Sequence, residues 1–414
     1  SNTTGGIIIA QAQGRDLTVT GGITGQTRLG ITSIAPALAG LPELQVIVDQ
    51  TDAMQDAFVL ANADGKVSAS AGMRAYDYHL ANRSDGAWLE RAPGAPAYSP
   101  GGKAILNSAS LGAVNWFHAI GALHKRMGDI RAGAASRQDG SPAKGGVWFR
   151  ANGGRLNAGN STPGLAFTQY HYGLTAGLDT AWTPAGGGSL LLTGAFLDTG
   201  GVERDFDGPS DGSTRMLGAG LYATWLHQDG WYADLVAKHE GNKHEFDTNA
   251  PAPDAAMSAD YRTRAQGISL EVGRSLVKQG GWWVEPALQA AIVWLGAADY
   301  TTKSPVDDNN VHVRLEQSTV AQYRAQLRAG RVLDGGRWTP YVKAAAAYED
   351  TRGGALHAEG GRISLGRDGW RAEFGAGLSC RLGRDGQLYF DYEYTRASDY
   401  ERPWLVHLGY RKSW

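Results

Sequence analysis

The chain has 414 residues, a formal net charge of −2 and a single cysteine. Its mean hydropathy is negative and it holds no apolar run of about 18 residues, so a membrane protein built from helices is excluded. One cysteine excludes an intrachain disulfide framework, and the near-neutral charge argues against a nucleic-acid partner. The chain begins Ser1-Asn2-Thr3-Thr4, which a cleaved signal peptide and a trimmed terminus would explain equally well.

The N-terminal residues 1–90 have the pattern of short β-strands separated by turns. We predict strands at residues 16–20, 28–34, 43–51, 57–61, 75–80 and 88–90, with hairpin turns at Asp64-Gly65 and Asp85-Gly86. So short a segment is small for an independent core. We therefore expect a small β-solenoid-like module over residues 1–90 that caps or joins a larger part. Residues 91–108, rich in Pro, Gly and Ala, are predicted to be a linker.

Residues 109–135 carry the strongest helical pattern. No proline occurs between Ser110 and Arg131, and apolar side chains recur there at spacings of three and four. At about 1.5 Å per residue this helix would be roughly 30 to 40 Å long, enough to thread a barrel across a membrane. We predict a pore helix, with packing outside the barrel or against the module as the alternative. Its expected site residues are Trp116, Ile120, Leu123, His124, Lys125, Arg126, Met127 and Arg131.

From residue 144 to residue 414, about twelve segments of roughly 10 to 20 residues alternate between apolar and polar side chains. In residues 387–395, Leu388 and Phe390 alternate with Tyr389 and Asp391. The polar faces hold many Gly and Tyr, as expected for a hydrated lumen rather than the charged solvent face of a sandwich. An even number of strands closes an antiparallel barrel without a free edge, which is the only sheet that can span lipid. The charges expected in the lumen, facing the helix, are Glu285, Arg371, Glu373, Asp391 and Glu393.

Residues 404–414 form an alternating strand at the end of the chain. Val406, Leu408, Tyr410 and Trp414 fall on one face, with an aromatic residue at either end of that face. This pattern is typical of an outer-membrane barrel, although an edge strand of a soluble sandwich would share it. Recurrence of the pattern upstream decides between them. The sequence therefore predicts an all-β protein with an antiparallel outer-membrane barrel of about 12 strands, a pore-spanning helix and a small N-terminal module.

Short motifs occur along the chain in a fixed order. They include Asp16-Leu-Thr-Val-Thr-Gly and Phe58-Val-Leu-Ala-Asn-Ala-Asp-Gly in the module, Ala122-Leu-His-Lys-Arg-Met-Gly in the helix, Gly146-Val-Trp-Phe-Arg150 at the first barrel strand and Gly409-Tyr-Arg-Lys-Ser-Trp414 at the last. In this order the chain resembles the translocation end of a monomeric (type V) autotransporter of the pertactin-like family. One departure is Lys412, where the family usually has an aromatic residue; a long stem can snorkel to the headgroups there.

The resemblance implies that residues 144–414 form a barrel in the bacterial outer membrane, with residues 1–90 at the cell surface as passenger end or autochaperone module. It assigns Val406, Leu408, Tyr410 and Trp414 to recognition by the barrel-assembly machinery. Expected partners are outer-membrane lipid, that machinery, periplasmic chaperones and host surface molecules, with no cofactor and no nucleic acid. The implied function is export and display of a passenger, of which residues 1–90 are either the whole or only the end.

The resemblance also bears on passenger release. Self-cleaving relatives carry an Asn four residues before the Lys of a Lys-Arg-(Met/Leu)-Gly motif, and the chain breaks after that Asn. Here Lys125 opens the motif, so the equivalent positions are Gly121 and Ala122. Glycine has no side chain to attack its own carbonyl, and Asn115 lies roughly 9 Å away along a helix axis. We therefore predict that the passenger is not released by self-cleavage.

Three other functions remain as alternatives. An outer-membrane enzyme would need a catalytic or metal cluster, but the histidines are scattered, and Gly208-Pro-Ser-Asp-Gly212 lies in a polar loop without the strand-to-helix turn of a nucleophile elbow. We expect no enzymatic activity and no metal. A plugged or open porin is the second alternative. The third is an adhesin or virulence factor whose activity lies in a passenger beyond this sequence.

Overall fold

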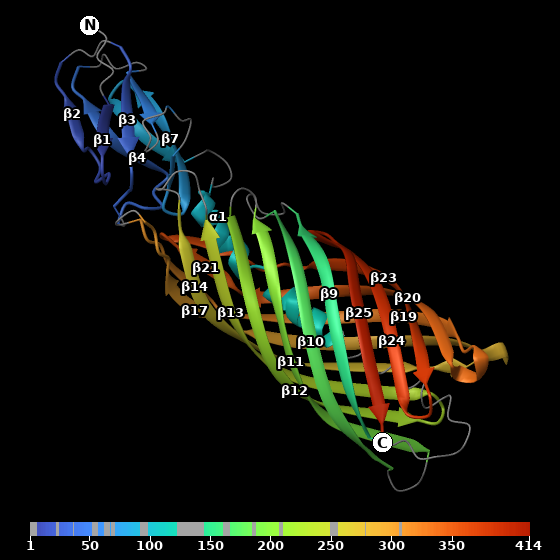
Figure 1. Ribbon diagram of the computed structural model, residues 1–414. Coiled ribbons are helices and arrows are strands. Elements are labelled where there is room, and N and C mark those ends of the chain that lie inside the picture. The colour runs from blue at the N-terminus through green and yellow to red at the C-terminus, as the bar shows by residue number, and fades with distance from the viewer. Residues whose placement is uncertain are drawn as a thin grey trace.

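The computed structural model describes residues 6–21, 25–35, 37–51, 57–61, 67, 71–91, 98–121, 145–159, 166–183, 188–206, 210–248, 256–277, 279–305 and 309–414. The N-terminal module, a helical segment and a β-barrel follow one another along a single long axis (Figure 1). No helix within the described ranges is long and apolar enough to cross a membrane.

The barrel has twelve long strands, each antiparallel to both of its neighbours. Pairing of the first strand with the last closes the cylinder, so the predicted twelve-stranded antiparallel barrel is confirmed. The strands are β9 (Gly146–Ala158), β10 (Phe167–Trp182), β11 (Ser189–Phe206), β12 (Ser210–His227), β13 (Trp231–Thr248), β14 (Ser258–Arg274), β16 (Trp282–Leu295), β19 (Ser318–Arg331), β20 (Trp338–Gly353), β23 (Gly369–Leu382), β24 (Gly386–Ala397) and β25 (Tyr400–Ser413). The short β15 (Leu276–Val277) also pairs with β16, and the 3₁₀ turns η2 (Gln279–Gly281) and η3 (Asp334–Gly336) precede β16 and β20.

Side chains along the barrel strands alternate between a lipid-facing and a lumenal side, as the sequence predicted. On β12, Leu217 and Leu221 are exposed, whereas Tyr222 and Thr224 are buried. Exposed tryptophans gather near both ends of the strands, as interfacial aromatics do in outer-membrane barrels. Trp182, Trp225, Trp231, Trp282 and Trp338 lie toward the end where β9 begins, and Trp294, Trp370 and Trp404 lie toward the other.

The helical segment starts earlier than predicted. Helix α1 spans Pro100–Ala109, inside the stretch assigned to a linker, and helical residues 112–121 follow after a turn. Ser99 caps α1 by accepting a hydrogen bond from Gly102 N (3.0 Å), with a proline at the first helical position, and both are helix-start signals. The linker predicted over residues 91–108 is therefore wrong from Pro100 onward. The rest of the predicted helix, 122–135, lies outside the described residues.

The module combines two small sheets. Strands β1 (Gly6–Ile9), β3 (Thr27–Ile31) and β5 (Phe58–Ala61) form a parallel sheet, which is the solenoid-like arrangement that was predicted. The second sheet runs β2 (Leu17–Val19), β4 (Glu43–Asp49), β8 (Gly86–Arg91), β7 (Tyr76–Arg83) and β6 (Ala71–Met73). Strands β1 and β6, of four and three residues, were not predicted.

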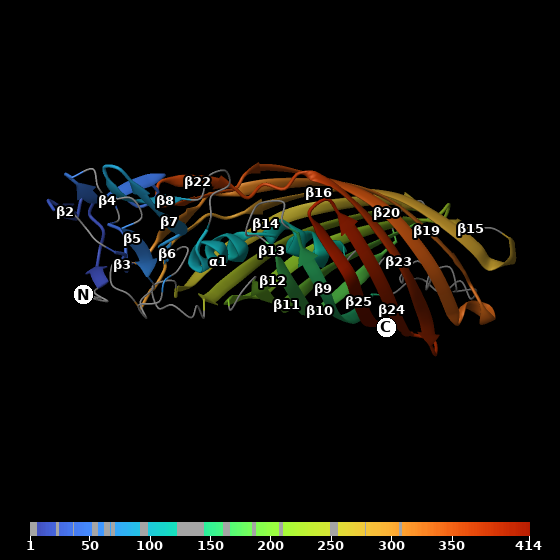
Figure 2. The same ribbon diagram turned by 90° about the horizontal axis from the view of Figure 1, so that it is seen from above.

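The module rests on a sheet built from two barrel loops. Strands β17 (Ala298–Thr301) and β18 (His312–Leu315) come from one loop, and β21 (Ala355–Ala358) and β22 (Gly361–Ser364) from another. The guanidinium of Arg74 pairs with Glu359 of this sheet, and Arg74 N donates to Asn309 Oδ1 (2.9 Å). One hydrophobic cluster runs through module, α1 and loop sheet. This continuity joins the module to the barrel mouth, as Figure 2 shows.

Candidate functional site

Arg204, on β11, fixes the point at which the helical segment passes into the barrel. Its guanidinium donates to the carbonyl oxygens of Ser108 (3.1 Å) and Ser110 (3.4 Å) at the end of α1, where helical carbonyls lack partners. Its Nε donates to Gln169 Oε1 (3.0 Å), and Gln169 donates to Asn115 Oδ1 (2.8 Å). A cation at this position also complements the helix dipole. Buried Arg204 therefore fixes the turn between α1 and the helical residues 112–121 by hydrogen bonds.

The helical residues after this break bury an apolar face against the barrel wall. Trp116 and Ile120 are fully buried, and Phe117 packs beside them. Gly267 of β14 leaves the space that Trp116 fills, since a Cβ there would lie 2.7 Å from Trp116 Cζ2. The predicted stripe therefore packs inside the barrel, not outside it. The wall contributes Val236, Ala265, Ala291, Val293 and Val320.

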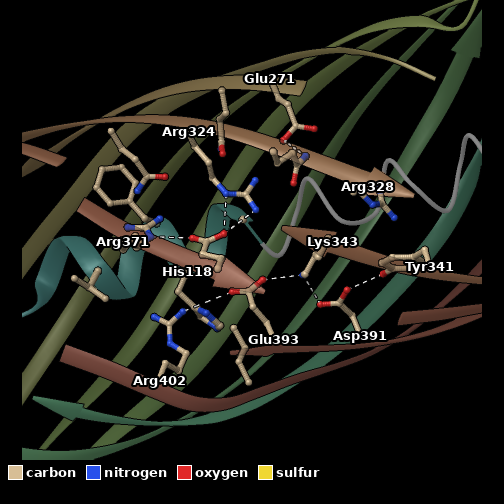
Figure 3. A pocket seen from close by; sticks show the side chains of 18 residues that line it. His118, Glu271, Arg324, Arg328, Tyr341, Lys343, Arg371, Asp391, Glu393 and Arg402 are labelled. Carbon is tan, nitrogen blue, oxygen red and sulfur yellow. Dashed lines mark hydrogen bonds and ion pairs between the residues drawn. The ribbon is translucent and has the colours of Figure 1, made fainter. Parts of the chain in front are cut away.

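Another face of the same helix borders a polar cavity in the lumen (Figure 3). Val114, Phe117, His118 and Gly121 line it from the helix. The wall opposite is densely charged and draws on strands from β14 round to β25. Its charged lining residues are Glu271, Arg324, Arg328, Lys343, Arg371, Glu373, Asp391, Glu393 and Arg402.

These charges form buried ion pairs. Lys343 Nζ lies 2.8 Å from Asp391 Oδ1 and 2.7 Å from Glu393 Oε2. Arg324 and Arg371 share Glu373, each at 2.8 Å, and Arg371 also pairs with Glu349. In a buried pair the desolvation cost is offset only while both partners stay, so each pair constrains the strands that carry it.

Four of the predicted lumen charges, Arg371, Glu373, Asp391 and Glu393, line this cavity, whereas the fifth, Glu285, is buried in the lumen beside Arg328 (3.4 Å). Their partners among the described residues are cations of the strands, not of the helix. The helix cations expected to meet them, His124, Lys125, Arg126 and Arg131, lie outside the described ranges. So do Leu123 and Met127 of the predicted apolar stripe and Ala122 of the cleavage-equivalent position.

The sequence analysis missed the basic half of the cavity wall. Arg324, Lys343 and Arg402 were not predicted, although Arg324 and Lys343 lie between apolar residues at the same alternation as the acids. The signal was therefore present as strand parity. What the sequence did not contain was the pairing of strands, which decides that Lys343 meets Asp391.

A second cavity lies on the other side of His118 and is lined by Asn115, Asn152 and His171 among others. The ring centroids of His118 and His171 are 4.4 Å apart, and those of His118 and His407 are 5.6 Å apart. Asn115 therefore points away from the cavity that holds Glu373 and Glu393. In the described part of the chain no group of three His, Cys, Asp or Glu could hold a metal ion.

The terminal strand β25 completes the cylinder. Leu408 and Trp414 are exposed on the lipid side, with Val406 and Tyr410 half-buried on the same side. Trp414 N donates to Gly145 O (3.2 Å), and Arg411 binds Asp179 through two hydrogen bonds of 2.7 and 2.6 Å. The four residues assigned to assembly recognition therefore form one outward stripe next to the closing seam.

Comparison with known proteins relates this architecture to one protein family. The family model described as Autotransporter beta-domain matches residues 147–393. The pertactin autotransporter of Bordetella bronchiseptica is 31% identical over 401 residues, covering 86% of this chain and 42% of that protein. The BrkA autotransporter of Bordetella pertussis is 29% identical over 412 residues, covering 98% of this chain and 38% of that protein. The chain thus spans less than half the length of these curated relatives.

A solved structure agrees with the sequence matches. The crystal structure of the β domain of the Bordetella autotransporter BrkA aligns with a TM-score of 0.55 and 28% identity, over 66% of this chain and 100% of that one. The translocator domain of NalP from Neisseria meningitidis shares the fold, with a TM-score of 0.50 and 15% identity over 72% of this chain and 98% of that one. Because the family model covers more than half of the sequence, the chain belongs to the autotransporter β-domain family, whose barrels lie in the bacterial outer membrane.

Proposed function

We propose that this chain is the membrane end of an autotransporter that exports its N-terminal passenger through the barrel and keeps it attached at the cell surface. The observation that carries the proposal is one continuous path of described residues, 98–121, from the module through the barrel mouth into the lumen. A chain left in this position after export would tie whatever precedes it to the membrane.

Contacts at the mouth support a fixed attachment. Ser99 Oγ accepts from Gly102 N (3.0 Å) and donates to Arg74 O (2.6 Å), so the cap of α1 is bonded to a turn of the module. Arg74 in turn pairs with Glu359 of the loop sheet. These contacts link the helix, the module and the barrel at one point. The module would therefore stand on the barrel rim rather than move freely above it.

The lumen supports attachment without self-cleavage. Gly121 borders the charged cavity but offers no amide to attack the backbone. Asn115, an amide-bearing residue earlier in the helix, accepts a hydrogen bond from Gln169 (2.8 Å) and faces the second cavity. The carboxylates of Glu373 and Glu393 are held in ion pairs. No described asparagine of the helix therefore meets an acidic group at the cleavage-equivalent position.

The test is to express the full chain and analyse the barrel recovered from outer membranes by N-terminal mass spectrometry. We expect one intact chain whose module is accessible to added protease on whole cells. A barrel fragment beginning at Ala122 would contradict the tether. Gly121→Asn, compared with Gly121→Ala, tests whether the missing side chain is what prevents cleavage. An Asn variant that cleaves where the Ala variant does not supports this reason.

A plugged barrel is favoured over an open porin because the helix fills the apolar half of the lumen. Planar-bilayer conductance of the intact chain and of a variant lacking residues 109–131 separates the two. We expect a small current for the intact chain and a larger one for the deletion. A large steady current in the intact chain would contradict the plug.

The proposed role is non-enzymatic, with any adhesive or other activity residing in the passenger. Ser210, the serine of the Gly-x-Ser-x-Gly match, begins barrel strand β12 and is buried, so it lacks the exposed turn that a nucleophile requires. We further propose that the stripe of Val406, Leu408, Tyr410 and Trp414 is the surface read by the barrel-assembly machinery, after delivery by periplasmic chaperones. Host surface molecules are the proposed partners of the passenger.

A further inference from the structure

Arg215, Lys243 and Arg262 form a row of cations on the lipid-facing side of the barrel. They occupy directly opposite positions on three neighbouring strands, with Arg215 facing Lys243 on β12 and β13, and Lys243 facing Arg262 on β13 and β14. Each has one buried neighbour along its strand, Thr214, His244 or Tyr261, and one half-buried neighbour, which places the three side chains outward by strand alternation. Like charges directly opposite each other repel, so this row is unfavourable unless an anion lies among them.

The row borders a glycine on the outward side of the barrel, Gly241, and the open space over this glycine is here called the notch. Gly241 lies next below Lys243 on the outward side of β13, between Leu217 and Arg264 on the flanking strands. A Cβ at Gly241 would meet nothing nearer than Leu217 O at 4.0 Å, so the space above this glycine is open. Arg264 adds a fourth cation at its edge. The notch is therefore floored by backbone and bordered by cations.

Most of this positive charge is not compensated within the described residues. Lys243 pairs with Glu245 at 2.5 Å, in a pair whose side chains are both 41% exposed. Arg215, Arg262 and Arg264 form no ion pair with any residue that the structure describes. The nearby Asp260 pairs instead with Lys303 (3.5 Å). Three guanidinium groups thus remain available to an external anion.

The height of the row places it at the membrane surface. Arg215 and Trp225, which belongs to the opposite aromatic girdle, are both on β12. Their separation of about ten residue steps corresponds to about 25 Å along the membrane normal, from a rise of about 3.3 Å per residue and a strand tilt near 40°. That distance matches the apolar band of an outer-membrane barrel. On β16, Trp294 faces Gln266, one outward position below Arg264.

We propose that these four cations bind the phosphate group of an outer-leaflet lipid. Several guanidinium groups around one open point suit a phosphate, which accepts paired N–H donors. The notch opens sideways toward lipid, and below it Leu217 and Leu221 are exposed to receive an acyl chain. A phosphorylated lipid would contact both the cations and the exposed leucines below them, whereas a free phosphate would contact only the cations.

The test is a titration of the folded full chain in a zwitterionic detergent with a fluorescent lipopolysaccharide. Replacing Arg215, Arg262 and Arg264 together by Gln should weaken binding by about 100-fold, or roughly fivefold for each charge removed. Arg352→Gln is the matched control, since Arg352 is an exposed cation at the same end of the barrel that already pairs with Asp350. Its affinity should not change.

Two further arms identify the ligand. Dephosphorylated lipopolysaccharide should bind the wild-type chain as weakly as intact lipopolysaccharide binds the triple variant. Inorganic phosphate should compete with intact lipopolysaccharide only at a far higher concentration than phosphorylated lipid does. Equal affinity of the wild-type chain and the triple variant would overturn the site. Competition by inorganic phosphate at the concentration of the lipid would overturn the assignment to lipid. Heat-modifiability checks that the triple variant is folded, and Arg262→Gln and Arg264→Gln alone replace it if it is not.

Discussion

Replacing Trp116 by alanine should loosen the helix in the lumen without preventing the barrel from forming. Trp116 is fully buried and fills the space that Gly267 leaves open on β14. Truncating a buried large aromatic side chain to alanine costs about 3 to 5 kcal/mol. The indole N–H of Trp116 finds no hydrogen-bond partner among the described residues, so its removal returns about 1 kcal/mol or more.

The net loss of about 2 kcal/mol corresponds to a roughly 30-fold shift from the plugged toward the unplugged state. Single-channel recording of the purified chain measures this shift directly as the fraction of time spent conducting. Trp294→Ala is the matched control, because it makes the same change at an exposed position on the lipid face. Gly267→Val should also unseat the helix, but a Cβ there would lie 2.3 Å from Ile292 O as well as 2.7 Å from the indole, so this variant strains the pairing of β14 with β16 too.

An open fraction unchanged by Trp116→Ala, in a barrel that remains heat-modifiable, would refute the idea that this apolar contact seats the helix. A rise in Trp294→Ala as large as in Trp116→Ala would show that general destabilisation, not the lumenal contact, controls opening.

Three further predictions concern the lumen, the seam and the rim. Arg371→Leu would leave the carboxylate of Glu373 with one partner fewer and should lower stability by about 3 to 5 kcal/mol; an unchanged melting temperature would count against the ion-pair network. Deleting Trp414 should leave misassembled protein in the periplasm, and normal amounts of heat-modifiable barrel in membranes would contradict this. Burial raises the pKa of the Glu359 carboxyl above its ordinary value near 4.5, although Arg74 acts to lower it. Because this pKa is raised on folding, Glu359 stabilises the docked module at pH values below its unfolded-state pKa. This stabilisation is lost as pH rises through the folded-state pKa. The melting temperature should therefore fall, as pH rises from about 4.5 through the raised folded-state pKa of Glu359, by more than in Glu359→Gln, and equal slopes in the two proteins would exclude this role.

Strand parity made the barrel readable from the sequence alone. Each lipid-facing position is set by its own strand, so Leu388 and Phe390 could be placed outward without knowing their neighbours. The same local logic placed Asp391 and Glu393 in the lumen. The ion-pair partners of these acids could not be predicted in the same way, because Lys343 meets them only through the register of strands far apart in the sequence. Parity therefore predicted the faces but not the pairs.

The predicted start of the helix, at residue 109, was wrong for a related reason. A proline at the first turn of a helix and a proline in an extended linker look alike until the capping hydrogen bond is seen. Ser99 and Pro100 supply that cap here, and the turn of Ala75 packs against Gly102 too closely for any Cβ. The contact that orders α1 thus comes from the module, and no pattern within residues 91–108 contained it.

The pairing of β9 with β25 also sets the order in which the barrel can close. The seam joins residue 146 to residue 413 and residue 158 to residue 400, so the first barrel strand gains its second partner only when the twelfth strand is in place. Hairpins such as β11–β12 need only local contacts and can form much sooner. The seam therefore forms last, around a segment that precedes the barrel in the chain. A chain that lacks β25 would form a curved sheet with two open edges, which cannot shield its backbone from lipid.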